Sequence, residues 1–247
     1  MKLLFDIGNT LIKWAHYSEG RVGSSTSIDT ANVSLAELTK TFADVNRPEE
    51  IWVSSVGSEQ ALNAIVEWSI ETHGLKPNVI QVSDSSCGIS NNYLTRDTLG
   101  VDRWVAAIGA RVVIPAGHVI IVDAGTAVTI DWLSDDNIYE GGVILPGLSL
   151  MHASLNSKTA GIKSIYTQAD KIIGRTTEEC VNSGVSYGLI GGIERVIEEM
   201  MLKIPEPATI LLTGGSASIL MAMSKLEMSL QENLVLMGVA KVSNEVT

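Results

Sequence analysis

The sequence Leu-Leu-Phe-Asp-Ile-Gly-Asn-Thr occupies residues 3–10, and Ile-Ile-Val-Asp-Ala-Gly-Thr occupies residues 120–126. In each stretch an apolar segment that favours a β-strand runs into an aspartate, small turn-forming residues and a threonine. The recurrence of this order near the start and near the middle of the 247-residue chain indicates an internal duplication. We therefore predict two similar halves, residues 1–115 and 116–247, with the boundary at the turn-forming Pro-Ala-Gly that begins at Pro115.

Strand and helix patterns alternate around the two repeated stretches. Apolar runs bounded by turn residues predict strands, whereas apolar residues spaced three or four apart predict helices. Such an alternation favours an α/β architecture. The expected strands are residues 2–5, 12–16, 51–56, 79–82, 119–122 and 208–213, with a returning strand and turn over 139–147; the expected helices are residues 35–42, 61–73, 99–111 and 188–201.

The composition is that of an ordered globular protein and excludes several other classes. Hydrophobic residues make up 45% of the chain and the mean hydropathy is +0.23. Charged residues and a proline interrupt the longest apolar region, residues 105–130, so no membrane helix is predicted. An early Asp6 is incompatible with a signal peptide, and we expect a cytoplasmic protein with Cys87 and Cys180 reduced. The net charge of −11 disfavours general nucleic-acid binding.

The turn at residues 6–10 has residues suited to binding phosphate. Its glycine lets backbone N–H groups approach an anion, its asparagine and threonine donate hydrogen bonds, and Lys13 adds a positive charge. The carboxylate of Asp6 is suited to hold a hydrated magnesium ion beside the phosphates. An ordinary asparagine-containing β-turn would have the same residues. The second copy at Asp123 and the glycine pair at residues 214–215 favour nucleotide binding.

The two aspartate turns and the late glycine pair together resemble the superfamily that contains actin, heat-shock chaperones, sugar kinases and acetate kinases. The resemblance implies a duplicated ribonuclease-H-like (actin-like) fold, in which two similar α/β halves border an active-site cleft. It does not identify the molecule that accepts the phosphoryl group, because one fold hosts many functions.

Further motifs resemble those of type III pantothenate kinases, over almost the whole chain. Tyr93 is followed by Gly-Val-Asp-Arg-Trp at residues 100–104. This resemblance implies ATP-dependent phosphorylation of pantothenate to 4′-phosphopantothenate, the first step of coenzyme A synthesis. The other motifs, in that family's order, are Asp-Ile-Gly-Asn-Thr at 6–10 with Lys13-Trp14, Asp-Ala-Gly-Thr-Ala-Val-Thr at 123–129, Gly-Gly-Val-Ile-Leu-Pro-Gly at 141–147, Gly-Arg-Thr-Thr at 174–177 and Thr-Gly-Gly at 213–215.

The same resemblance implies which residues bind and activate pantothenate. Asp102 would be the base that accepts the hydroxyl proton, and the guanidinium of Arg103 is suited to bind the pantothenate carboxylate. A helix start with an internal salt bridge is the alternative for this pair. For Thr177 the alternative is a helix N-terminus. The implied pantothenate-binding residues are Tyr93, Gly100, Val101, Asp102, Arg103 and Thr177.

ATP, Mg²⁺ and a monovalent cation, K⁺ or NH₄⁺, are the ligands implied besides pantothenate. Asp123 would bind the monovalent cation, although a second carboxylate beside magnesium is an alternative for this residue. The family also implies a homodimer with the substrate pocket at the interface. The implied contacts to ATP are Asp6, Ile7, Gly8, Asn9, Thr10, Leu11, Ile12, Lys13 and Thr126.

Two other functions stay open at this stage. One is a nucleotide-binding accessory protein that aids transcription without kinase activity, and the other is a kinase for a different small hydroxyl acceptor. The chain also departs from the family's pattern at Lys163, Ser216 and Met237, where a proline, an acidic residue and a glutamate are common. These departures concern a loop, the adenosine side and the C-terminal segment.

Overall fold

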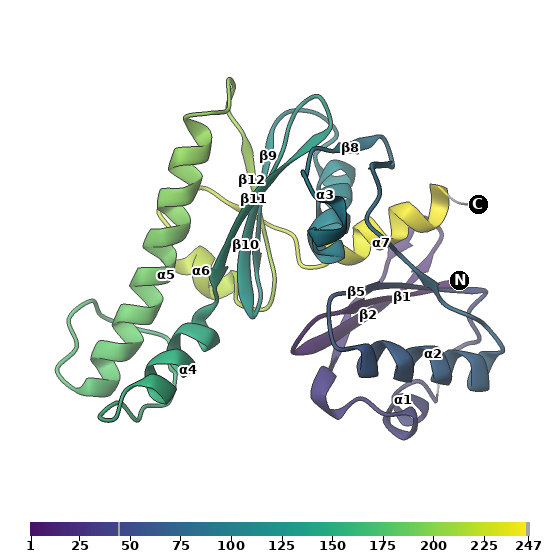
Figure 1. The fold of residues 1–247 in the computed structure, drawn as a ribbon, viewed down its shortest axis with the longest axis horizontal. Coiled ribbons are helices and arrows are strands. Elements are labelled where there is room, and N and C mark those ends of the chain that lie inside the picture. The colour runs from purple at the N-terminus through teal and green to yellow at the C-terminus, as the bar shows by residue number, and fades with distance from the viewer. Residues whose placement is uncertain (44, 246–247) are drawn as a thin grey trace. The chain divides into compact units, whose positions relative to one another are not determined.

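The computed structural model describes residues 1–43 and 45–245, which form two compact units (Figure 1). Unit 1 contains Met1–Pro115, Asn137–Tyr139 and the chain from Asn233 onward. Unit 2 contains Ala116–Asp136 and Glu140–Glu232. Each unit is a group of residues that contact one another, whereas each predicted half is one copy of a duplicated segment. The division into residues 1–115 and 116–247 therefore stays a prediction.

Unit 1 is built on a mixed sheet in the order β3-β2-β1-β5-β6, with β4 pairing the first half of β2. Its central strand β1 is antiparallel to β2 and parallel to β5. The strands of this unit are β1 (Lys2–Ile7), β2 (Leu11–Ser18), β3 (Arg21–Val22), β4 (Thr26–Asp29), β5 (Glu50–Ser55), β6 (Asn78–Val79), β7 (Ser85–Ser86) and β8 (Ile89–Asn91). Of these, β7 and β8 lie outside the sheet of β1. The helices are η1 (Thr30–Asn32), α1 (Leu35–Thr41), α2 (Glu59–His73), η2 (Arg96–Thr98), α3 (Val101–Val113) and α7 (Leu234–Glu245).

Helices cover both faces of this sheet. Alternate residues of β1, namely Leu3, Phe5 and Ile7, are buried in one core with side chains of α1 and α2. Helices α3 and α7 lie against the other face, over β1 and β5 (Figure 1). These two helices cross closely because a side-chain carbon at Gly109 or Gly238 would overlap backbone of the facing helix. The sheet is therefore fixed from both sides.

Unit 2 has a mixed sheet in the order β13-β12-β9-β10-β11. Strand β9 is antiparallel to β10 and parallel to β12. Helix α5 packs on α4 and on β10, and α6 packs beside β9 and β12 (Figure 1). The elements are β9 (Val119–Ala124), β10 (Ala127–Leu133), β11 (Ile138–Pro146), β12 (Thr209–Thr213), β13 (Ser229–Leu230), α4 (Leu148–Lys158), α5 (Thr177–Met201) and α6 (Ala217–Met223). The first residues of β11, Ile138 and Tyr139, belong to unit 1, where they pair with β8.

The two sheets have the same strand order, which confirms the duplicated α/β fold. Each has a central strand that turns back into an antiparallel neighbour and has a parallel strand on its other side. The two aspartates occupy equivalent positions: Asp6 pairs with Lys13 and Ser54, and Asp123 pairs with Thr129 and Thr213. The repeated turn thus marks a repeated topology.

Two predicted elements differ from the structure, and the C-terminal apolar segment, for which no element was predicted, forms a helix. The helix expected over residues 188–201 begins earlier, at Thr177, because Thr176 caps it and the glycines within it do not break it. The strand expected over 79–82 is shorter, Asn78–Val79, because it pairs only with β5 at the sheet edge. The closing apolar segment is helix α7.

Among the described residues, no helix is both long and apolar enough to span a bilayer.

Candidate functional site

The hairpin turn between β1 and β2 exposes its polar side chains, and hydrogen bonds fix its backbone. The N–H of Gly8 donates to the carbonyl of Leu11 at 3.0 Å, which closes the turn. The hydroxyl of Thr30 donates to the carbonyl of Gly8 at 3.0 Å. The side chains of Asn9 and Thr10 are exposed. The turn therefore offers hydrogen-bond donors to an anion from a rigid backbone.

The predicted ATP contacts in this hairpin divide into two kinds. Ile7 and Ile12 are fully buried in the core, so their side chains cannot touch a ligand and only their backbone can contribute. Asp6 and Lys13 are half-buried and directly opposite each other in the antiparallel pair. Leu11 is exposed at the tip. The hairpin thus combines one carboxylate and one ammonium group on adjacent strands.

Gly57 completes this turn, and the sequence analysis did not identify it. The N–H groups of Val56 and Gly57 donate to the carbonyl of Ile7 at 3.0 and 2.9 Å. A side-chain carbon at Gly57 would lie 2.7 Å from the carbonyl oxygen of Gly8. Only glycine fits at this approach. The available signal was a glycine directly after the predicted strand over residues 51–56.

The equivalent turn in unit 2 is enclosed by two glycine-containing segments. The N–H of Gly147, which precedes α4, donates to the carbonyl of Thr126 at 3.0 Å. The N–H of Ser216 donates to the carbonyl of Ala124 at 2.9 Å. This contact uses the backbone of Ser216, so the departure from an acidic residue does not remove it. The aspartate turn, the start of α4 and the glycine pair after β12 thus meet at one place.

Gly214 gives the carboxylate of Asp123 its space. A side-chain carbon at Gly214 would lie 2.5 Å from Oδ1 of Asp123 and 2.6 Å from the backbone N of Ala124. The φ angle of Gly214 is +96°, which side chains other than hydrogen rarely allow. Gly214 therefore packs directly against Asp123. The contribution of the glycine pair to nucleotide binding stays a prediction.

Asp102 and Arg103 lie in the first turn of α3, where Gly100 is the N-cap residue. The Oδ1 atom of Asp102 accepts the N–H of Arg103 at 2.8 Å, and a negative charge is favoured at a helix start. A side-chain carbon at Gly100 would lie 2.6 Å from the same Oδ1 atom. The carboxylate of Asp102 is half-buried and Arg103 is 6% exposed. The glycine therefore lets the aspartate fold back over the helix start.

Tyr93 lies beside Arg103 in unit 1. The Cζ atom of Arg103 is 5.8 Å from the centre of the Tyr93 ring, a cation–π arrangement. Tyr93 follows β8 and Arg103 lies in the first turn of α3, so residues on either side of η2 meet in unit 1. Val101, the remaining member of this group, is buried. Five of the six predicted acceptor residues thus come from two segments of unit 1.

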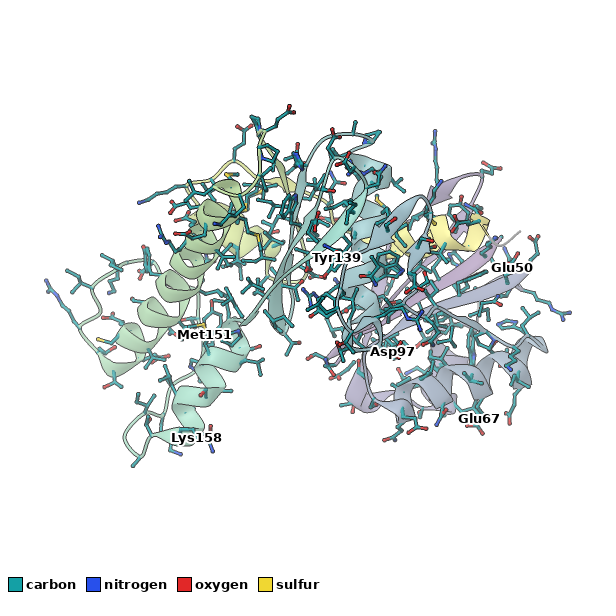
Figure 2. The ribbon with its side chains drawn as sticks, turned by 45° about the horizontal axis from the view of Figure 1, so that its top comes forward. Glu50, Glu67, Asp97, Tyr139, Met151 and Lys158 are labelled. Carbon is teal, nitrogen blue, oxygen red and sulfur yellow. The ribbon has the colours of Figure 1, made fainter. Side chains whose placement is uncertain are left out.

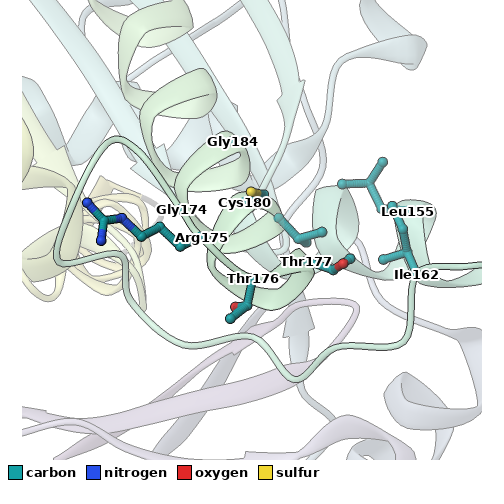
Figure 3. A pocket seen from close by; sticks show the side chains of 9 residues that line it. Leu155, Ile162, Gly174, Arg175, Thr176, Thr177, Cys180 and Gly184 are labelled. Atoms are coloured by element: carbon teal, nitrogen blue, oxygen red, sulfur yellow. The ribbon is translucent and has the colours of Figure 1, made fainter.

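Thr177 lies in unit 2, in a pocket of about 500 Å³ at the start of α5 (Figure 3). Thr176 caps the helix by accepting the N–H of Glu179 at 3.2 Å, so Thr177 is not the capping residue. The side chain of Arg175 extends away from Leu155, on the far side of the pocket (Figure 3). The pocket is lined by Leu155, Ile162, Gly174, Arg175, Thr176, Thr177, Cys180, Val181 and Gly184.

The loop before α5 is tied to the helix by Glu179. Its carboxylate accepts the ammonium group of Lys171 at 2.7 Å and the N–H of Arg175 at 2.6 Å. The hydrogen bond from Lys171 lowers the pKa of Glu179 most, and the hydrogen bond from the N–H of Arg175 lowers it further. A side-chain carbon at Gly174 would overlap the backbone N of Cys180. The rim of the pocket is therefore held against the first turn of α5.

Neither a metal cage nor a disulfide occurs within the described part of the chain. Residues 1–43 and 45–245 contain no group of three His, Cys, Asp or Glu side chains that could hold a metal ion. Cys87 and Cys180 are free. Burial raises the pKa of the Cys87 thiol to about 11, so this thiol is protonated at neutral pH.

Comparison with known proteins gives a consistent result. The sequence model of the family described as type III pantothenate kinase matches residues 2–199. A type III pantothenate kinase from Nitrosococcus oceani is 31% identical, over 99% of this chain and 94% of that protein. Among solved structures, a candidate 2-dehydro-3-deoxygalactonokinase from Sinorhizobium meliloti superposes with a TM-score of 0.62 at 13% identity, covering 100% and 99% of the two chains. A candidate Baf family transcriptional activator from Campylobacter jejuni gives 0.60 at 19% identity, covering 99% and 98%. The two structural matches establish the actin-like fold alone.

Proposed function

Because the chain belongs to the type III pantothenate kinase family, we infer that it transfers the γ-phosphoryl group of ATP to pantothenate. The product is 4′-phosphopantothenate, so the reaction is the first step of coenzyme A synthesis. The observation that carries this proposal is the group at the start of α3, where Asp102 and Arg103 lie beside Tyr93. A carboxylate, a guanidinium and an aromatic ring are suited to a ligand that has a hydroxyl, a carboxylate and an apolar body.

Asp102 is proposed as the base of the transfer. Its carboxylate accepts the proton of the pantothenate hydroxyl as that oxygen forms a bond to the γ-phosphorus, and the bond from phosphorus to ADP breaks. Arg103 is proposed to bind the pantothenate carboxylate with two parallel hydrogen bonds. Gly100, Val101, Tyr93 and Thr177 are proposed to complete the acceptor site.

The hairpin of residues 6–13 is proposed to bind the phosphates of ATP. Exposed Asn9 and Thr10 supply side-chain donors, Gly8 allows close backbone approach, and Lys13 supplies charge. The carboxylate of Asp6 fits a hydrated Mg²⁺, since hard oxygen ligands and retained waters are typical of this ion. Bound magnesium would neutralise charge on the phosphate oxygens. The phosphates and retained waters would supply the remaining oxygen ligands of the ion.

Asp123 is proposed to bind a monovalent cation, and Thr126 to contact ATP. We expect that Asp123→Ala abolishes the stimulation of turnover by K⁺, because it removes the only charged ligand proposed for the ion. Initial rates would be measured while K⁺ and Mg²⁺ are varied independently, for the wild type, this variant and Asp136→Ala. Asp136 is an exposed aspartate of the same unit and serves as the control. Retained K⁺ stimulation with a raised Mg²⁺ requirement would assign Asp123 to magnesium instead.

A homodimer is proposed, with unit 2 supplying the contact. Unit 2 exposes large apolar side chains on β11 and on the loop before α5: Ile144 is 60% exposed, Ile165 76% and Ile173 75%. Large apolar side chains that are exposed in one protomer would be covered at an interface between two copies. The occupant is proposed to be a second copy of this chain, with the pantothenate pocket at the interface. Light scattering should therefore give twice the mass of one chain.

The activity is tested by measuring ADP release with a panel of acceptors. With ATP, Mg²⁺ and K⁺ present, pantothenate should stimulate ADP release, whereas hexoses and 2-keto-3-deoxy sugar acids should not. Stimulation by a sugar but not by pantothenate would show that the acceptor is a sugar, whereas the assigned fold and the use of ATP would stand. The cytoplasmic location stays a prediction from the sequence.

A further inference from the structure

We propose that Asn91 is a positioning residue for the acceptor site, because its amide group fixes the segment that carries Tyr93. The inference rests on the proposed function, since it assumes that Tyr93 and Arg103 bind pantothenate. Asn91 is the last residue of β8 and is half-buried. It was not among the site residues expected from the sequence.

The side chain of Asn91 joins the two ends of the β7–β8 hairpin. Its Oδ1 atom accepts the backbone N–H of Tyr93 at 2.9 Å, and its Nδ2 atom donates to the carbonyl of Ser83 at 3.2 Å. Its own backbone N–H donates to the carbonyl of Asp84 at 2.9 Å. An asparagine that accepts the N–H two residues later fixes a local turn. This amide therefore holds the backbone of Tyr93 against the start of the β7–β8 hairpin.

Besides the hydrogen bond to Asn91, the segment around Tyr93 is attached by the N–H of Asn92, which donates to the carbonyl of Tyr139 at 3.0 Å, and by exposed Arg96, which donates to Oδ1 of Asp84 at 3.3 Å. Leu94 is completely exposed, and residues 95–98 are exposed as well. Such a segment gains little from apolar burial, so its backbone position depends on hydrogen bonds at its ends. The hydrogen bond from Asn91 lies at the end that adjoins Tyr93.

The ring of Tyr93 lies beside both Tyr139 and Arg103. The ring centres of Tyr93 and Tyr139 are 6.4 Å apart, and Cζ of Arg103 is 5.8 Å from the Tyr93 ring. Tyr139, labelled in Figure 2, is fully buried, and it is paired with Asn91 between β11 and β8. Its ring meets Trp104 edge-on at 6.2 Å. Trp104 follows Arg103 in α3. The side chains of Tyr93, Tyr139, Trp104 and Arg103 therefore form one connected cluster.

This cluster explains how Asn91, which lies outside the proposed acceptor site, would affect the affinity for pantothenate. An arginine side chain has many rotamers, and binding is weakened when the rotamer must be fixed at the moment of association. The Tyr93 ring restricts the guanidinium of Arg103 before pantothenate arrives. Loss of the Asn91 bridge would release Tyr93 and hence the guanidinium. The effect should fall on pantothenate binding and not on ATP or on the chemical step.

The test compares three variants of the full-length protein with the wild type. Asn91→Ala removes both side-chain hydrogen bonds, whereas Asn91→Asp keeps the oxygen that accepts the Tyr93 N–H. Asn63→Ala replaces an exposed asparagine on α2 of the same unit and is the control. The KM for pantothenate, the KM for ATP, kcat and the melting temperature are measured for each.

We expect Asn91→Ala to raise the KM for pantothenate about ten-fold, the effect of losing hydrogen bonds to a partly buried group. Its KM for ATP and its kcat should stay within about two-fold of wild type. Asn91→Asp should recover most of the loss, and Asn63→Ala should match the wild type. An unchanged KM for pantothenate in Asn91→Ala would overturn the inference. A parallel rise of both KM values with a lower melting temperature would also overturn it, because that pattern indicates general damage.

The wild-type measurement separates this inference from the proposed function. A wild type without pantothenate-dependent turnover rejects the proposed function and, with it, the role of Asn91. A wild type that turns over pantothenate, together with an Asn91→Ala variant that behaves identically, rejects the positioning role alone.

Discussion

Asp102→Asn is expected to lower kcat for pantothenate phosphorylation by about 10²–10⁴-fold, the usual contribution of a positioned general base. The amide has nearly the shape of the carboxylate and can still accept the N–H of Arg103, but it cannot take up the hydroxyl proton. Rates would be measured by coupled ADP release at saturating pantothenate and ATP. The melting temperature should change little, because Asp102 is half-buried at a helix start.

Asp97→Asn is the matched control for this experiment. Asp97 lies five positions earlier, is exposed, and forms a surface ion pair with Arg96. Exposed ion pairs of this kind contribute little to stability, so turnover should be unaffected. A fully folded Asp102→Asn protein that retained more than about a tenth of wild-type kcat would contradict the assignment of the base. The same variant would also distinguish a purely regulatory role, which does not need the carboxylate.

Arg103→Lys is expected to raise the KM for pantothenate by about 10²-fold with a smaller effect on kcat. Lysine keeps the charge but lacks the planar fork that binds a carboxylate through two hydrogen bonds, and it stacks less well on Tyr93. Replacement of one partner of a buried charge pair commonly costs about 2–5 kcal/mol, which corresponds to this change. Steady-state kinetics with pantothenate varied would measure it.

A substrate analogue makes the test of Arg103 specific. Pantothenol has a hydroxymethyl group in place of the carboxylate of pantothenate, so it lacks the group that the arginine is proposed to bind. Wild type and Arg103→Lys should therefore use pantothenol with similar, high KM values. Arg195→Lys, at an exposed arginine of α5, is the control for the substitution itself. An equal loss with both substrates would show that Arg103 does not contact the carboxylate.

The duplicated fold was predictable because its signal is local. An apolar strand followed by Asp, small residues and Thr is a short pattern, and it appears twice in the chain. In both places it forms the same structure, because Asp6 and Asp123 occupy equivalent positions in two sheets of the same strand order. The start of α5 also had a local signal in Thr176, which caps the helix. The glycines that follow it concealed the length of that helix.

The remaining features depend on contacts between distant segments, which no local pattern contains. The apolar segment from Leu234 gave no indication that it would pack as α7 against α3, where Gly238 allows the close crossing. Gly57 resembled any glycine after a strand until the carbonyl of Gly8 was found beside it. Asn91 was likewise an ordinary polar residue until the structure showed which N–H its side chain accepts.

The most direct test of the central claim is the identity of the phosphorylated product. Purified protein would be incubated with pantothenate, Mg²⁺, K⁺ and ATP labelled with ³²P at the γ-phosphate, and the products separated by chromatography and identified by mass spectrometry. We predict that the label appears in 4′-phosphopantothenate in amounts equal to the ADP released, and that it does so with wild type but not with Asp102→Asn. Label that remains in ATP, or appears only in inorganic phosphate, would contradict the assignment of this chain as a pantothenate kinase.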